Sequence, residues 1–270
     1  MWSCPHCRLP LNPDGEKSLA CDSGHRFDQA REGYVNLLPA NRKRSKEPGD
    51  SKDMIAARGR IHDGAHFRPL AEKLAKLALI HHGPAPTLLD LGCGEGYYSQ
   101  VLLEKLPEAT LYGIDISKAA IRRAAKSCRQ GDFAVASAFD IPLADHSLDL
   151  VCSVFAPADT GQLQRVLQPG GAYLKVIPGP EHLQELRALL YDEAKPHSDD
   201  LNLPSGFEIQ EEQTLAYPVT LDSETLLDLV AMTPYAHRGK REQKSDLGKL
   251  APLELTMAFK LALMRRSLGT

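Results

Sequence analysis

Four residues near the start of the chain have the types and the spacing of metal ligands: Cys4, Cys7, Cys21 and His25. They form a Cys-x2-Cys pair and, after a spacer of 13 residues, a Cys-x3-His pair. Each pair can bind one ion from a tight turn, and two pairs complete the tetrahedral coordination that structural zinc prefers. We therefore predict one structural Zn²⁺ with no open position for a substrate. The alternative is disulfides or unrelated cysteine pairs, and disulfides require an oxidising compartment.

A second segment combines glycines and carboxylates in a pattern typical of a nucleotide-binding turn. Residues 88–96 have the sequence Leu-Leu-Asp-Leu-Gly-Cys-Gly-Glu-Gly, a short apolar strand that ends in alternate glycines. Because Gly92, Gly94 and Gly96 carry no side chain, a ligand can approach the backbone there. A dinucleotide fingerprint needs its third glycine one residue later. The negative charge of Asp90 would repel a pyrophosphate. It suits a ligand with a cationic ammonium and sulfonium, such as S-adenosylmethionine.

Later positions fit the rest of such a ligand. Asp115 ends the next apolar strand, where its carboxylate can accept hydrogen bonds from both ribose hydroxyls. Ser137 and Ala138 follow the third strand, where an adenine edge would lie. The turn 169–171 leads into the fifth strand, and the four elements in this order predict a methyltransferase domain. A generic turn in an α/β protein would leave Asp115 unexplained. The predicted cofactor contacts are Asp90, Gly92, Gly94, Glu95, Gly96, Asp115, Ile116, Ser137 and Ala138.

The apolar periodicity predicts the elements that position these residues. Helices are expected over residues 53–60 and 68–80, and from residue 87 onward strands alternate with helices. The expected strands are 87–91, 110–114, 133–136, 148–153, 172–177, 207–215 and 253–263, and the expected later helices are 96–106, 118–128, one ending at 163–167, 181–192 and 223–232. The predicted fold class is therefore α/β, a doubly wound, mostly parallel, seven-stranded methyltransferase sheet preceded by a small zinc-binding module.

Length and composition suit one large domain with a small appendage. The chain has 270 residues, of which 43% are hydrophobic and 25% are charged. It contains no apolar run of about 18 residues, and no basic segment precedes an apolar one near Met1. We expect no membrane span, no secretory signal and a cytoplasmic location, with the other three cysteines as buried free thiols.

Charge is distributed unevenly along the chain. Residues 1–70 hold 12 Lys/Arg and 9 Asp/Glu, whereas the remaining 200 hold 20 and 26. Residues 42–46 include four cations, and this run is either a solvated linker or an arm that contacts phosphates. The basic bias at the front weakly favours contact with nucleic acid there. The basic side chains considered for this role are Arg8, Arg26, Arg31, the run 42–46, and Arg238, Lys240, Arg241 and Lys244.

Further motifs resemble one enzyme family. Residues 87–177 resemble class I methyltransferases, and motifs outside them are similar to large-subunit (23S) ribosomal RNA guanine-N1 methyltransferases with an N-terminal zinc module. These motifs are Phe27-Asp28, Gly33-Tyr34-Val35-Asn36-Leu37-Leu38-Pro39, Pro48-Gly49-Asp50, Pro178-Gly179-Pro180, His182-Leu183 and Met232-Thr233-Pro234-Tyr235. The resemblance covers nearly the whole chain. It implies methyl transfer to N1 of a guanine in a hairpin loop of the large ribosomal RNA by a homodimer whose RNA cleft lies between zinc modules.

The resemblance also implies two more cofactor contacts, Phe67 and His182. Position 67 is often Tyr in relatives, so Phe67 keeps the ring for stacking and lacks a hydroxyl. Guanine N1 carries a proton that must leave, and a general base would help. Asp159, after the fourth strand, is our candidate for that base, and His62 and His66 are the alternatives. Phe155 either stacks on the target base or packs in the core.

We divide the chain into a zinc-binding RNA-recognition module (1–40), a basic linker and helix (41–69) and a class I methyltransferase domain (70–270). Two other functions stay open. One is a small-molecule methyltransferase with a purely structural zinc module, which the basic front disfavours. The other is a catalytically silent RNA-binding assembly factor, which intact Asp90 and Asp115 disfavour.

Overall fold

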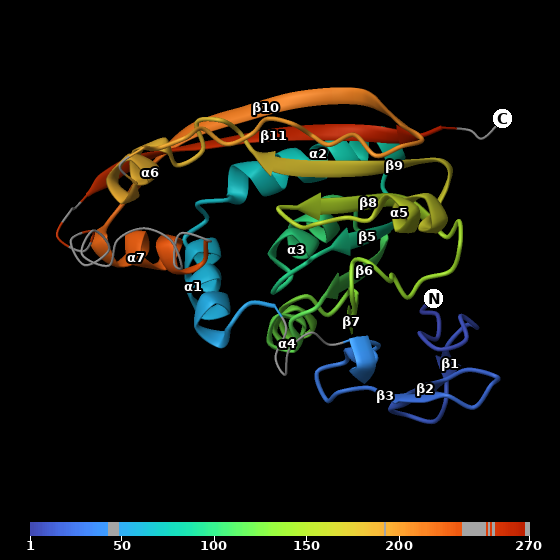
Figure 1. Cartoon of the computed structure of the whole chain (residues 1–270). Coiled ribbons are helices and arrows are strands. Elements are labelled where there is room, and N and C mark those ends of the chain that lie inside the picture. Colours follow the sequence, from blue (N-terminus) through green and yellow to red (C-terminus); the bar gives the residue numbers. More distant parts are fainter. Residues whose placement is uncertain (43–48, 192, 234–246, 248, 250–251, 268–270) are drawn as a thin grey trace.

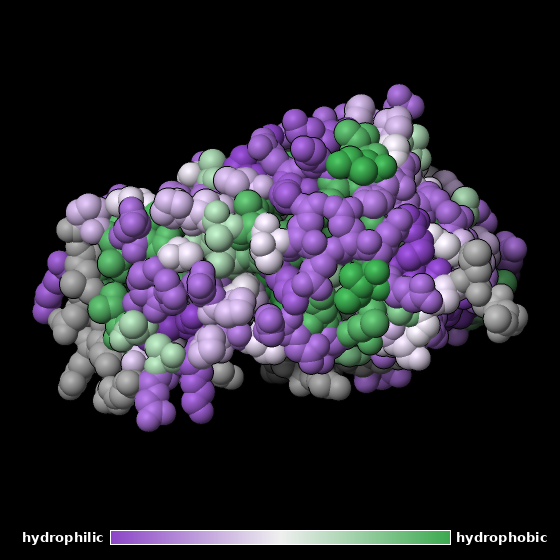
Figure 2. All heavy atoms as spheres, turned by 90° about the horizontal axis from the view of Figure 1, so that it is seen from above, coloured by the Kyte–Doolittle hydropathy of each residue, from purple (hydrophilic) through white to green (hydrophobic). Residues whose placement is uncertain are grey.

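A mixed sheet forms the spine of the protein, and a small N-terminal module lies beside one of its ends (Figure 1). The computed structural model describes residues 1–270 except 43–48, 192, 234–246, 248, 250–251 and 268–270. Among the described residues, no helix is both long enough and apolar enough to cross a bilayer. The face above β10 and β11 is mostly hydrophilic, with small separate apolar patches (Figure 2).

The main sheet has the strand order β10-β11-β9-β8-β5-β6-β7-β4. The strands from β4 to β9 are parallel to their neighbours, and β11 runs antiparallel to both β9 and β10. The α/β class and the seven predicted strands are confirmed. The bounds are β4 Val35–Asn36, β5 Thr87–Leu91, β6 Thr110–Asp115, β7 Asp132–Val135, β8 Leu148–Val154, β9 Leu167–Pro178, β10 Phe207–Leu221 and β11 Leu253–Arg266.

The eighth strand, β4, is the main difference from the predicted sheet. Val35 pairs with Ala134 and Asn36 with Val135 of β7, and the Leu37 N–H donates to Val135 O at 2.9 Å. A strand of two residues has no measurable periodicity, so the sequence pattern could not reveal it. The predicted turn 169–171 lies inside β9 instead, where the register against β8 shifts.

Seven α-helices pack around the main sheet in the described part of the chain. Side-chain oxygens of Ser51, Ser117, Asp159 and Asp222 accept backbone N–H groups and so fix four of the helix starts. The predicted helix 181–192 is shorter than expected, because Leu183 adopts a left-handed backbone just before α6. The bounds are α1 Lys52–Asp63, α2 Arg68–His82, α3 Tyr97–Lys105, α4 Lys118–Ser127, α5 Thr160–Val166, α6 Gln184–Leu190 and α7 Ser223–Ala231.

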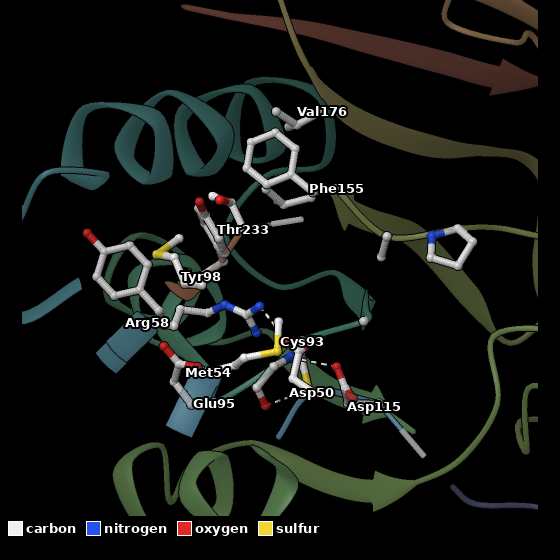
Figure 3. A pocket seen from close by; sticks show the side chains of 18 of the residues that line it. Asp50, Met54, Arg58, Cys93, Glu95, Tyr98, Asp115, Phe155, Val176 and Thr233 are labelled. Carbon is white, nitrogen blue, oxygen red and sulfur yellow. Dashed lines mark hydrogen bonds and ion pairs between the residues drawn. The ribbon is translucent and has the colours of Figure 1, made fainter. Parts of the chain in front are cut away.

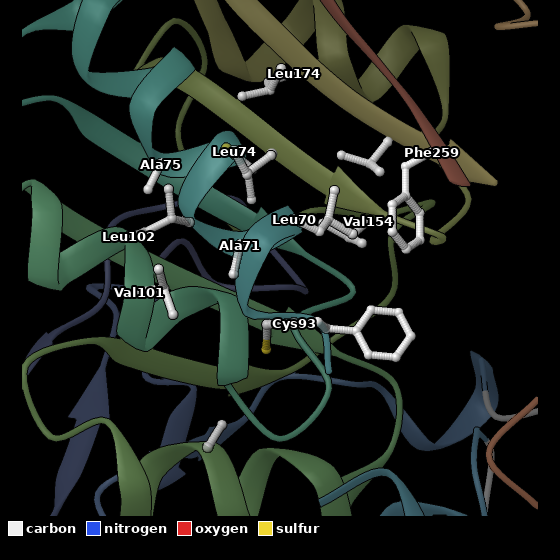
Figure 4. Close-up of a cluster of buried hydrophobic side chains, with 14 of the residues drawn as sticks. Leu70, Ala71, Leu74, Ala75, Cys93, Val101, Leu102, Val154, Leu174 and Phe259 are labelled. Atoms are coloured by element: carbon white, nitrogen blue, oxygen red, sulfur yellow. The ribbon is translucent and has the colours of Figure 1, made fainter. Parts of the chain in front are cut away.

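Successive strand residues point to opposite faces of the sheet and contribute to two hydrophobic clusters, one on each face. On one face, Leu70 and Leu74 of α2 pack with Leu102 of α3, Val154 of β8 and Leu174 of β9 (Figure 4). Leu70, Leu74 and Leu77 recur at helical spacing along α2, and all three are buried. This core fixes the carboxyl ends of the parallel strands, where α/β sheets bind ligands.

The N-terminal module shares the cluster on the other face. Its own sheet joins β1 (Asn12–Pro13), β2 (Ser18–Ala20) and β3 (Arg26–Asp28). Trp2 packs edge-on against Tyr112 of β6 with ring centroids 5.0 Å apart, and forms a bridge with Leu143. The module is therefore continuous with the core of the large domain.

Candidate active site and metal centre

The four predicted metal ligands converge on one point. All their donor atoms lie within 4.8 Å of one another. The Cys7 and Cys21 sulfurs are 3.5 Å apart, and His25 Nδ1 lies 3.5 Å from Cys4 Sγ and 3.4 Å from Cys21 Sγ. Zinc bonds of about 2.3 Å to sulfur and 2.0 Å to nitrogen separate tetrahedral ligands by about 3.5–3.8 Å. The cysteines are free thiols, so the donor set fits one structural zinc and not a disulfide.

Two backbone turns hold these ligands. The Arg8 N–H donates to Cys4 O at 2.9 Å, and the Gly24 N–H donates to Cys21 O at 2.8 Å. Gly24 has a φ of 80°, which favours glycine there. A hydrogen bond from the Leu9 backbone N–H lowers the pKa of Cys7 to about 6, which favours the thiolate that zinc binds.

A cavity of about 1160 Å³ opens at the carboxyl ends of β5, β6, β8 and β9 (Figure 3). Helix α1 and the start of α3 form the opposite wall. Ligand pockets usually measure about 300–1,000 Å³. The volume therefore admits a nucleoside-sized cofactor and leaves room for a second group.

Most of the predicted cofactor residues meet in this cavity. Those that line it are Phe67, Gly92, Gly94, Glu95, Asp115, Ile116, Ser137, Ala138 and His182. Gly96 lies elsewhere: with a φ of 86° it precedes α3, and a Cβ there would come within 3.0 Å of Ala124 Cβ on α4. Gly96 therefore allows two helices to pack, and the prediction of ligand contact at this residue gains no support from its position.

Asp115 braces the glycine turn. Its Oδ2 accepts the Gly94 N–H at 3.1 Å, and its Oδ1 accepts the Ser117 N–H at 2.7 Å. Burial raises the pKa of this carboxyl, and the two backbone donors oppose that shift. Each oxygen keeps a further lone pair, so the same carboxylate can both shape the turn and accept ligand hydroxyls.

Asp90 lies beneath the turn and not in the cavity lining, in contrast to its predicted ligand contact. Only 2% of the residue is exposed, and the Ser99 hydroxyl donates to its Oδ2 at 2.6 Å. Burial raises the pKa of Asp90 to about 6. Its carboxylate therefore lies on the core side of the glycine turn and not on the side that faces the cavity.

We expect Asp90→Asn to stabilise the ligand-free protein above about pH 6. The folded state holds a proton that the unfolded state releases between about pH 4 and 6, so ionised Asp90 costs folding free energy on the order of 1–3 kcal/mol at pH 7.5. The amide oxygen of Asn can still accept from Ser99. Urea unfolding at pH 7.5 and pH 4 checks this, because the gain should vanish at the lower pH. A less stable variant at pH 7.5 would contradict it.

The three candidates for a general base have different positions. Asp159 caps α5, where its Oδ1 accepts the Gln162 N–H at 2.9 Å, and it does not line the cavity. His66 also lies outside the lining, and burial lowers its pKa. His62 does line the cavity, and its Nδ1 lies 2.7 Å from Glu95 Oε1. Asp159 thus has a structural role as a helix cap, and His62 is the one of these three candidates that lines the cavity.

Phe155 stands out on the cavity wall (Figure 3). It is 46% exposed and has a φ of 56°, an unusual backbone for a bulky residue. Phe259 lies 5.9 Å from Phe155, 5.9 Å from Phe67 and 4.8 Å from His182, so these rings form one aromatic wall. Exposure favours stacking on a ligand over core packing, and strain of this kind is typical of functional sites.

The sequence pattern missed most of one side of the site, where it had singled out only His62, as an alternative general base. Met54, Arg58 and His62 of α1 recur every four residues and all line the cavity. Their spacing is visible in the sequence. However, α1 lies about 30 residues before the glycine turn, and nothing in its own sequence indicates that the helix packs over that turn. Phe139, 62% exposed, is a further lining residue that the pattern missed.

The basic side chains considered for RNA contact differ in their surroundings. Arg8 pairs with Asp140 and Arg26 with Asp14, while Arg31 is exposed. Residues 43–46 of the basic run, and Arg238, Lys240, Arg241 and Lys244, lie outside the described residues. Pro234 and Tyr235 of the family motif do so as well, whereas Met232 and Thr233 line the cavity.

Known proteins share both parts of this arrangement. The family models "RlmA, N-terminal" and "Methyltransferase domain" match residues 2–46 and 88–171. The solved structure of the YcgJ protein from Bacillus subtilis superposes with a TM-score of 0.52 over 73% of this chain and 99% of that one. At 15% identity this likeness shows the fold alone. Fold, cavity and zinc ligands define a class I, S-adenosylmethionine-dependent methyltransferase with an N-terminal zinc ribbon.

Relatives that match along their whole length define the family. The 23S rRNA (guanine(748)-N(1))-methyltransferase of Streptomyces fradiae is 35% identical over 97% of this chain and 95% of its own. YxjB of Bacillus subtilis, provisionally named a 23S rRNA (guanine-N(1)-)-methyltransferase, is 32% identical over 95% and 94%. Malonyl-acyl-carrier-protein O-methyltransferase 1 of Coxiella burnetii matches only 52% of this chain. This chain belongs to the 23S rRNA guanine-N1 methyltransferases, as its motifs predicted.

Proposed function

We propose that this protein transfers a methyl group from S-adenosylmethionine to N1 of a guanine in a hairpin loop of large-subunit ribosomal RNA. Family membership over nearly the full chain supports the substrate class. The observation that carries the proposal is an exposed, strained aromatic residue, Phe155, in a cavity of about 1160 Å³, which is above the range of about 300–1,000 Å³ usual for ligand pockets. Bases taken out of a stack are commonly held on such rings.

The cofactor supplies a methyl group made electrophilic by its sulfonium. We propose that Gly94 and Glu95 border its amino-acid end, that Asp115 accepts the ribose hydroxyls with Ile116 beside them, and that Ser137 and Ala138 border the adenine. Support comes from the common position of these residues in the cavity wall. Gly92 lets the turn lie against Ala156, where a Cβ would come within 2.4 Å of the Ala156 Cβ.

Phe67 and His182 complete the proposed cofactor site. His182 Nδ1 accepts the Ala258 N–H at 3.3 Å, and burial lowers its pKa to about 3. The ring is therefore neutral at pH 7, with its proton on Nε2. A neutral donor can contact the cofactor without repelling the sulfonium, and the Phe67 ring packs nearby against Phe259.

The guanine N1 proton must leave during the reaction, and Asp159 serves as the cap of α5 and not as the base that removes it. Asp159→Asn keeps an oxygen that can cap α5 and removes the basic group. We therefore expect single-turnover transfer to stay within about threefold of wild type. A loss of about 100-fold or more, with unchanged thermal stability, would instead reinstate Asp159 as the base.

We further propose a cytoplasmic homodimer that holds RNA between its zinc modules, with the domain division 1–40, 41–69 and 70–270. The family resemblance supports the dimer, and the shared core of module and sheet supports a fixed position of the zinc site. The basic residues of the module, among them exposed Arg31, would contact phosphates, and such binding should weaken steeply with salt.

A transfer assay tests the function. Labelled S-adenosylmethionine is incubated with the zinc-loaded protein and with unmodified large-subunit ribosomal RNA, and the modified position is mapped by the stop it causes in primer extension. We expect label at guanine N1 and none in RNA whose target guanine is replaced by adenine. Label in small metabolites would favour the small-molecule methyltransferase. Cofactor binding without transfer to any substrate would favour the silent assembly factor.

A further inference from the structure

One face of α1 is directed into the cavity above the glycine turn (Figure 3). The Arg58 side chain extends over the glycine turn. Its Nη1 lies 3.6 Å from the position that a Cβ on Gly94 would occupy. Its side chain is 22% exposed and forms an ion pair with Asp50 through Nη2. The other guanidinium nitrogen therefore stands over the turn, where it can donate to a ligand.

A carboxylate without a full set of partners lies beside this cation. Glu95 Oε1 pairs with His62 Nδ1, whereas Glu95 Oε2 is buried and has no hydrogen-bond partner among the described residues. The Glu95 side chain is only 10% exposed. A buried carboxylate oxygen without a donor is costly, so this oxygen is placed to accept a hydrogen bond from a ligand.

His62 holds Glu95 in place. Its ring stacks on Tyr97 with centroids 4.0 Å apart and meets Phe67 edge-on at 5.5 Å. These two ring contacts orient His62 so that its Nδ1 can donate to Glu95 Oε1 at 2.7 Å. His62 is thus a positioning residue for Glu95.

We propose that α1 and Glu95 form the subsite for the zwitterionic amino-acid end of the methyl donor: Arg58 binds its carboxylate and Glu95 its ammonium. This inference deepens the proposed function, because it rests on the same donor cavity. Asp50, Glu95 and Asp115 outnumber Arg58 in charge around the cavity. That balance suits a donor whose ammonium and sulfonium outnumber its carboxylate.

Ligands that lack one group at a time test the subsite by calorimetric titration, without any turnover. S-adenosylmethionine carries both groups, decarboxylated S-adenosylmethionine lacks the carboxylate, and methylthioadenosine lacks both groups and the sulfonium charge. We expect Arg58→Leu to weaken the first about 10- to 100-fold and the other two by less than about threefold. Arg58→Lys, which keeps the charge, should lose less. Glu95→Gln should weaken the first two ligands alike and spare methylthioadenosine.

Arg60→Leu is the matched control. Arg60 lies on the same helix but pairs with Asp228 of α7 at 2.6 Å, away from the cavity. We expect its variant to bind all three ligands as wild type does. Equal losses for S-adenosylmethionine and methylthioadenosine in Arg58→Leu, or no loss for either, would overturn the subsite. If wild type binds the donor as expected but leaves ribosomal RNA unmethylated, the proposed function fails while the subsite stands.

Discussion

Asp115→Ala is expected to raise the Kd for S-adenosylmethionine by about 100-fold or more. Two hydrogen bonds from ribose hydroxyls to one carboxylate are together worth at least about 3 kcal/mol. The variant also removes the acceptor for the Gly94 and Ser117 N–H groups, so the glycine turn loses its brace. Both effects act on the same ligand site and in the same direction.

Calorimetric titration measures this change, with Asp132→Ala as the control. Asp132 is an exposed carboxylate at the amino end of β7, the opposite end of the same parallel sheet, so it changes the charge equally without touching the cavity. An unaltered Kd in Asp115→Ala would refute the cofactor assignment.

The same carboxylate predicts a pH effect. Burial raises the pKa of Asp115, and only its ionised form accepts both hydroxyls. Donor affinity in wild type should therefore fall as the pH is lowered, beginning at a higher pH than an exposed aspartate would give.

Cys21→Ser is expected to abolish methylation of ribosomal RNA while leaving donor affinity within about threefold. The free energy of binding structural zinc is also folding free energy for a module this small. Cys21 and Cys4 are buried with Trp2 and Leu19 of the same module, so loss of the ion should disorder the module. All of residues 1–40 are described, and none of them lines the cavity, which explains the spared donor site.

Three measurements separate these effects: zinc content by mass spectrometry, donor Kd by calorimetry and transfer to unmodified ribosomal RNA. Cys128→Ser is the control, because it removes a buried free thiol at the end of α4 that lies outside the zinc site. Stoichiometric zinc and normal transfer in Cys21→Ser would rule out the metal centre as assigned.

The sequence predicted those parts of the site that short segments determine. The zinc ligands lie in two tight turns, so their spacing alone predicted their convergence. Asp115, Ser137 and Ala138 were predictable because parallel strands end at the same edge of a sheet. The alternation of strands and helices and the presence of helix α2 followed from apolar periodicity in the same way.

Other parts depend on long-range packing that spacing does not encode. Asp90 and Gly96 flank the glycine turn, yet Asp90 is buried in the core beneath it and Gly96 packs against a neighbouring helix. Arg58 enters the site only because α1 packs against α7 and α4. Asp159 follows a strand that does border the cavity, but its position before α5 makes it a cap.

β4 has a consequence for the supply of the protein in the cell. Without Val35 and Asn36, the β7 edge of the parallel sheet would present unpaired amides and carbonyls to other chains, a common route to aggregation. The module that holds β4 is itself held by the metal. Chains made during zinc starvation should therefore be lost to aggregation or proteolysis, so that the zinc supply also sets how many copies of the protein survive in the cell.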